Sequence, residues 1–248
     1  MELKESLLLL RKNSRIYHKK IINSIIYQDK VNVCPFCSSE NNLTKEHVIP
    51  KWVFGNRSEK YFTTNTNGLE QTYSKATIPA CSFCNTQILS TLEHEIVRKM
   101  RGVNLVNEYF SDEDHNDIIL WLEIIEYKFH VLNMRRKFLK SKNGRFIPYL
   151  SEFPLSILQN NPLTPSQIFS VIRKAHRNLA VKSKSNRYNS LVVFRTTNPD
   201  FHFFHTTDHF IFLELAEFGV AFFYFFNREF KLLSQAHKEA NIIIDKVY

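Results

Sequence analysis

Four cysteines in two C-x-x-C pairs are the first candidates for chemistry in this sequence. Two sulfurs at this spacing can reach one metal ion, and four thiolates complete a tetrahedral zinc site. No cysteine is left over, and in a reducing compartment such pairs hold metal more often than they form disulfides. The alternative is two unconnected redox or buried pairs. We expect a closed, structural zinc site formed by Cys34, Cys37, Cys81 and Cys84.

Between the two pairs stands Glu46-His47-Val48-Ile49-Pro50, and Asn85 directly follows the last cysteine. A neutral imidazole can take a proton from water near neutral pH. Carboxylate and amide oxygens suit a hard divalent ion such as Mg²⁺. Side chains of these types can therefore supply a general base and the oxygen ligands of a divalent ion.

In combination, the two cysteine pairs, Glu46-His47 and the asparagine after the last cysteine resemble the zinc-bearing branch of the HNH endonucleases, which have the ββα-metal fold. The resemblance covers about Cys34 to Arg101. It implies that His47 is the general base and that Glu46 and Asn85 bind a catalytic Mg²⁺ or Mn²⁺ ion, as an H-N-N-like variant. Adjacent residues of a strand point to opposite faces, so Glu46 and His47 can share one site only at an irregular strand end.

Two positions depart from the family pattern. The residue after the last cysteine is usually a histidine and is Asn85 here, while the central asparagine that orients the base is replaced by Ala76. Asn65 or Asn67 is a candidate substitute for that asparagine. Glu93 follows Asn85 by two helical turns, ~12 Å along an α-helix, so it is expected to support the ion's ligands or to form a salt bridge rather than to bind the ion. The alternative is a surface carboxylate with no role in the site.

The sequence predicts that these residues are positioned by a strand, a loop, a second strand and a helix, in that order. We predict a strand from Leu43 to Ile49, a polar loop from Pro50 to Lys75, a strand from Thr77 to Ala80 and a helix from Asn85 to Arg101. A further helix is predicted from Leu3 to Tyr27. Residues 1–110 would form an HNH-like nuclease domain.

The acidic stretch Ser111 to Asp117 is the predicted domain boundary, and residues 111–248 would form an accessory domain for target recognition, regulation or oligomerisation. An apolar helix is expected from Ile118 to about Leu139 and another helix from Thr164 to Ala180. Four strands in an antiparallel meander and a closing helix follow, at 191–195, 201–205, 210–215, 220–226 and 234–246. The predicted fold class is α+β, with an N-terminal ββα-metal core and a C-terminal antiparallel sheet.

The charge of the chain favours a polyanionic partner. Lys and Arg number 33 against 24 Asp and Glu, a net charge of +9, which favours nucleic acid over a membrane. The start of the chain does not resemble a signal peptide, and no apolar run reaches the ~18 residues of a membrane helix. We therefore expect a cytoplasmic protein with no membrane contact.

The leading hypothesis is a metal-dependent endonuclease that cuts DNA, in restriction or anti-phage defence as the resemblance suggests. One alternative is a non-catalytic zinc-knuckle protein that binds nucleic acid. Another is an RNase toxin with the same core. The C-terminal domain would bind a protein partner or a second copy of the chain.

Overall fold

The computed structural model describes residues 34–37, 39–57, 63–66, 69–72, 75–102, 110–134, 185–207 and 209–247. They divide into two compact units that interleave along the sequence. The first unit takes its residues from Met1–Ile49, Tyr61–Thr91 and Tyr127–Val181, and the second from Pro50–Lys60, Leu92–Glu126 and Lys182–Tyr248.

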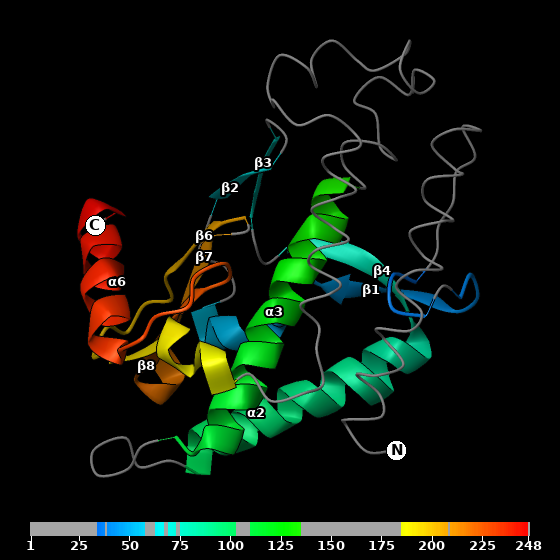
Figure 1. The fold of residues 1–248 in the computed structure, drawn as a ribbon. Coiled ribbons are helices and arrows are strands. Elements are labelled where there is room, and N and C mark those ends of the chain that lie inside the picture. The colour runs from blue at the N-terminus through cyan, green and yellow to red at the C-terminus, as the bar shows by residue number, and fades with distance from the viewer. Residues whose placement is uncertain are drawn as a thin grey trace. The chain divides into compact units, whose positions relative to one another are not determined.

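The first unit contains an antiparallel strand pair and the start of a helix, most of which belongs to the second unit; Figure 1 labels these elements. Strand β1 pairs with β4 from Leu43 opposite Cys81 to His47 opposite Thr77. A π-helix, η3, leads directly into α2. The bounds are β1 Leu43–His47, β4 Thr77–Cys81, η3 Cys84–Leu89 and α2 Ser90–Gly102. The predicted strand, strand and helix are thus present, and β1 stops two residues earlier than expected.

The stretch expected to be a polar loop contains regular structure, so that prediction is wrong. Strands β2 (Thr63–Thr66) and β3 (Leu69–Thr72) pair antiparallel in the first unit. A 3₁₀ helix, η1 (Lys51–Arg57), belongs to the second unit. Strand pairing depends on backbone hydrogen bonds, which polar side chains do not prevent, and threonine favours strands.

Helix α3 (Asp112–Met134) begins with a reciprocal cap. The Ser111 hydroxyl accepts from the Asp114 amide at 3.2 Å, and the Asp114 carboxylate accepts from the Ser111 amide at 3.0 Å, which together satisfy two free N–H groups of the first turn. The acidic stretch at which we place the domain boundary thus forms the start of this helix. The division into residues 1–110 and 111–248 stays a prediction.

The second unit is built on a four-stranded antiparallel sheet whose order is β5-β8-β7-β6. Strands β6 to β8 form the predicted meander, but β5 pairs with β8 instead of β6, so the full meander is wrong. The sheet strands are β5 Leu191–Arg195, β6 Phe203–Thr206, β7 Phe210–Leu215 and β8 Val220–Phe225. The chain between β5 and β6 includes Asn198 and His202, which both contact the buried Glu214 carboxylate.

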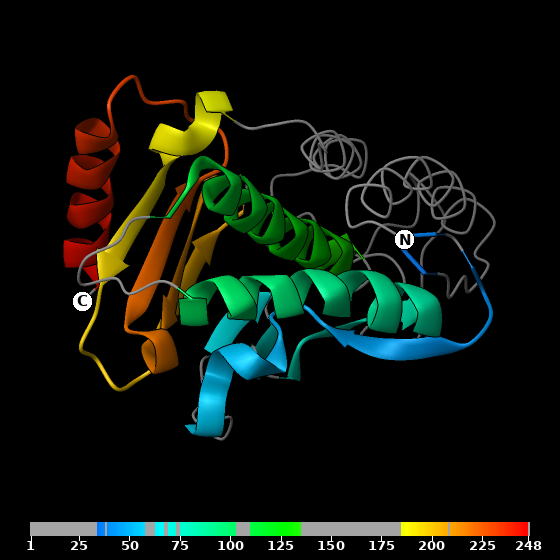
Figure 2. The same ribbon diagram turned by 90° about the horizontal axis from the view of Figure 1, so that it is seen from below.

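Helix α6 (Leu233–Val247) is the predicted closing helix. Its Ala236 and Ala240 pack against a phenylalanine-rich face of the sheet. Residues of α3 lie on the other face, where the Tyr224 hydroxyl donates to Glu123 at 3.0 Å; Figure 2 shows the strands between the two helices. The sheet is therefore covered on both faces, which explains why all six residues of β8 are buried.

The predicted helices at 3–27 and 164–180 lie outside the described residues, as does the predicted end of α3 beyond residue 134. Within the described part of the chain, no helix has the length and apolar character needed to cross a membrane. The architecture is α+β, with antiparallel sheets and a cluster of four cysteines.

Candidate metal centre and adjacent polar site

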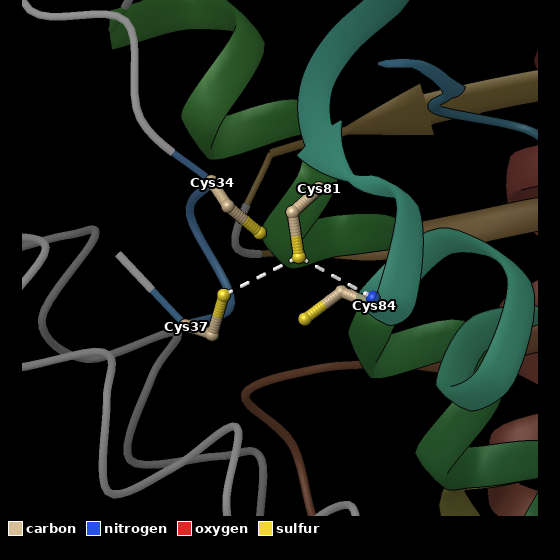
Figure 3. Close-up of side chains that lie close together, drawn as sticks. All are labelled: Cys34, Cys37, Cys81 and Cys84. Carbon is tan, nitrogen blue, oxygen red and sulfur yellow. Dashed lines mark hydrogen bonds between the residues drawn. The ribbon is translucent and has the colours of Figure 1, made fainter. Parts of the chain in front are cut away.

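The four cysteines converge on one point, as Figure 3 shows. Their sulfur atoms all lie within 4.8 Å of one another, and none forms a disulfide. A zinc–sulfur bond of about 2.3 Å in a tetrahedron places its sulfurs ~3.8 Å apart. A small contraction of the cluster therefore fits a metal ion such as zinc, and the predicted convergence of both pairs is confirmed. The sulfurs come from Cys34, Cys37, Cys81 and Cys84.

Backbone and side-chain bonds hold the cysteine cluster in place. The Cys34 amide donates to the Ser39 carbonyl at 2.8 Å and closes the turn that carries Cys34 and Cys37, here called the first knuckle. The Cys84 amide donates to the Cys81 sulfur at 3.4 Å. The hydroxyl of Tyr127, on α3, donates to the Pro35 carbonyl at 2.8 Å. The first knuckle is therefore fastened both to itself and to the C-terminal half of α3.

The thiols differ in acidity because Cys34 and Cys84 share a hydrogen bond and because the cluster is buried. A hydrogen bond from the Cys84 thiol outweighs burial and lowers the pKa of Cys34 to about 5. The same hydrogen bond, together with burial, raises the pKa of Cys84, while burial raises the pKa of Cys37 to about 12. A metal ion that binds all four sulfurs as thiolates must displace the protons of Cys37 and Cys84.

Glu46 points into the first unit and is paired with a lysine. Glu46 is 6% exposed, and its Oε1 atom accepts a hydrogen bond from Lys128, which is 1% exposed. The Lys128 ammonium also donates to the His47 carbonyl at 3.2 Å. Among the described residues, no other group bonds to the Glu46 carboxylate. One of the two carboxylate oxygens is therefore held by Lys128.

His47 is the last residue of β1 and is half-buried. The strand keeps a regular register through Glu46 and His47, so these two side chains start on opposite faces of β1. The ladder ends there, and the next backbone bond runs from the Val48 amide to the Ala76 carbonyl at 3.0 Å. The bend needed to bring imidazole and carboxylate to one site is thus absent from β1 itself.

Asn85 lies against the same face of β1 as Glu46. Its amide nitrogen donates to the Thr44 hydroxyl at 2.9 Å, and that hydroxyl donates to the Ala80 carbonyl at 2.9 Å. Because Thr44 and Glu46 are two residues apart in a strand, their side chains share one face. The amide and the carboxylate of the predicted site are therefore on one side of the strand pair.

The structure says less about the roles of the other predicted site residues, which are Glu93, Asn65 and Asn67, and about the position of Ala76. Glu93 is half-buried on α2. Asn65 lies on β2, where its backbone pairs with Glu70, while Asn67 lies outside the described residues. Ala76 is fully buried, and its methyl group cannot hydrogen-bond an imidazole. The orientation of His47 must therefore come from another group.

Sequence reasoning missed three residues that organise this region, namely Thr44, Tyr127 and Lys128. One signal was available for Lys128. It lies in a helix that is apolar around most of its circumference, where a charged residue must be buried and hence paired. Nothing in the local sequence identifies its partner, which lies 82 residues away.

No protein-family model, curated protein or solved structure matches this chain. The class of protein must therefore be inferred from the residues and their geometry.

Proposed function

We propose that this protein is a metal-dependent endonuclease of the HNH type that hydrolyses phosphodiester bonds in DNA. The observation that carries the proposal is the contact of Asn85 with Thr44. It joins the start of the helix to β1 and supports an arrangement in which the Asn85 amide lies on the strand face that carries Glu46. The surrounding order of strand, strand and helix, closed by four cysteines, supports the same assignment.

In this proposal the four thiolates hold a structural zinc ion, which stabilises the fold and takes no part in the reaction. The donor set beside it consists of oxygens, which suit Mg²⁺ or Mn²⁺. Such an ion would stabilise the charge on the phosphate and the leaving oxygen. Glu46 and Asn85 would hold the ion, and the His47 imidazole would take a proton from the attacking water.

The test is the conversion of supercoiled plasmid to nicked and linear forms in the presence of Mg²⁺ or Mn²⁺. His47→Ala should reduce the rate by about 10²–10⁴, the usual contribution of a general base, while metal analysis shows zinc content at the wild-type level. His94→Ala is the matched control, because His94 is exposed on α2 and should retain activity. Equal cleavage by wild type and His47→Ala would remove the imidazole from the mechanism.

A second candidate function is nucleic-acid binding without cleavage. Two observations favour it: the buried Ala76 stands where the family has its orienting asparagine, and Lys128 already pairs with Glu46. This candidate predicts that DNA is bound with a steep salt dependence and is never cut with any divalent ion.

If structured RNA is degraded and DNA is left intact, the enzyme is a ribonuclease.

A further inference from the structure

A short hydrogen-bonded relay runs from Ala80 through Thr44 to Asn85. The Thr44 hydroxyl lies 2.9 Å from the Ala80 carbonyl oxygen and 2.9 Å from the Asn85 amide nitrogen. All three residues belong to the first unit. Thr44 projects from β1 and Ala80 is its partner on β4, while Asn85 is the second residue of η3.

The relay determines which end of the Asn85 amide faces the strand. A carbonyl oxygen can only accept, so the single hydroxyl proton of Thr44 must point to Ala80. The Thr44 oxygen can then only accept from Asn85, and this requires the NH₂ group. The amide oxygen, Oδ1, must therefore point away from Thr44. Among the described residues, no group donates to it.

The backbone of Asn85 is held by the neighbouring cysteine cluster. It follows Cys84, whose sulfur belongs to the cysteine cluster, and the chain here is a π-helix, a conformation that is often found at functional sites. The cluster thus sets the position of the Asn85 backbone, and Thr44 sets the rotation of its amide. Together they leave one oxygen donor at a defined place.

The carboxylate of Glu46 is held in the same manner. Lys128 bonds to its Oε1, and Glu46 shares a face of β1 with Thr44. Glu46 is therefore held through Oε1, and Asn85 is held through its NH₂ group. Each of these two candidate ligands keeps one oxygen that could coordinate an ion. Partners of this kind fix the orientation of metal ligands in many proteins.

We infer that Thr44 is a positioning residue of the cation site, which selects Oδ1 of Asn85 as a ligand for a divalent metal ion. The inference rests on the proposed function for its cation. Thr44 itself does not touch the ion. It acts by preventing rotation of the amide, which would otherwise present an NH₂ group that cannot bind a cation.

The test measures Mn²⁺ binding to the full-length, zinc-loaded protein by the loss of the free-Mn²⁺ paramagnetic resonance signal. Thr44→Val keeps the shape of the side chain but removes the hydroxyl, and should weaken Mn²⁺ binding about tenfold, the lower end of the usual effect of such partners. Thr44→Ser keeps the hydroxyl and should bind Mn²⁺ as the wild type does. Zinc content should be unchanged in both variants.

A double-mutant cycle separates positioning from a general structural effect. If Thr44 acts only through the amide, Thr44→Val should weaken Mn²⁺ binding in the wild type but not in an Asn85→Ala background. Equal weakening in both backgrounds would overturn the inference. So would wild-type Mn²⁺ binding by Thr44→Val, or no Mn²⁺ binding by the wild type.

These outcomes are distinct from failure of the nuclease assignment. If Mn²⁺ binding depends jointly on Thr44 and Asn85 but the protein cuts neither DNA nor RNA, the positioning role is supported and the nuclease function is refuted. Mg²⁺-dependent cleavage that needs Asn85 but is indifferent to Thr44→Val supports the nuclease and refutes the positioning role.

Discussion

Replacement of Lys128 by methionine removes an ammonium group from the interior while it keeps a long, unbranched side chain. The lysine is 1% exposed, and its partner Glu46 is 6% exposed. Loss of one member of a buried ion pair leaves the other charge without compensation and typically costs about 3–5 kcal/mol. Because a domain is stable by only about 5–15 kcal/mol, the variant should be strongly destabilised.

The double variant Lys128→Met/Glu46→Leu provides the decisive comparison. It removes both charges and fills the space with apolar groups, an exchange that is often neutral or stabilising relative to the ion pair. The double variant should therefore be more stable than Lys128→Met alone. If Lys128→Met does not fold, a double variant that does fold still shows the predicted order of stabilities.

The free energy of unfolding is measured by urea denaturation of the zinc-loaded proteins at neutral pH, followed by circular dichroism. Arg98→Met is the control, because it breaks an ion pair between Arg98 and Glu95 whose side chains are 70% and 39% exposed, and its midpoint should match the wild type. A loss of less than about 1 kcal/mol in Lys128→Met would refute the reasoning, since it would mean that the Lys128–Glu46 pair is solvated.

Two further predictions concern the metal and the pH dependence of stability. Cys34→Ser and Cys84→Ser should each lower zinc content and stability together; unchanged metal stoichiometry in both would contradict the four-sulfur site. Burial raises the pKa of Asp114, but hydrogen bonds from Lys99 and Ser111 outweigh it and hold the pKa below its ordinary value of 3.8. The stabilisation is present above that value and is lost as the pH falls through the lower, folded-state pKa. Wild type should thus exceed Asp114→Asn in urea midpoint near neutral pH and converge with it in acid; a difference that does not vary with pH would argue against the Lys99 interaction.

The sequence predicts the cysteine cluster and the helix that follows it well, because their signals are local and chemically specific. The spacing within each cysteine pair suits one ion, and the absence of a spare cysteine indicates that the pairs share it. The helix after Cys84 repeats apolar residues at helical spacing, and Ile88, Leu89, Leu92 and Ile96 are indeed buried. Its first turns are a π-helix, which no propensity scale distinguishes from an α-helix.

Other features depend on information that a local pattern does not carry. The β2–β3 pair is polar, and its best signal is the dipeptide Asn67-Gly68 in the sequence between the strands, which is typical of a hairpin. The partner of β5 is set by the packing of the whole sheet, so four strand patterns alone do not exclude a simple meander. The Lys128–Glu46 pair joins segments that are 82 residues apart.

One short stretch of α3 carries the contacts that connect the cysteine cluster to the polar site. Tyr127 donates to Pro35 in the first knuckle, and the next residue, Lys128, bonds to Glu46 and to the His47 carbonyl. Successive residues of a helix project about 100° apart, so a single turn can direct Tyr127 to Pro35 and Lys128 to Glu46. Loss of catalysis in a variant of this turn is therefore ambiguous unless zinc content is measured too. Thr44 lies outside the turn, and its effect on the amide of Asn85 can be tested while both contacts of α3 remain intact.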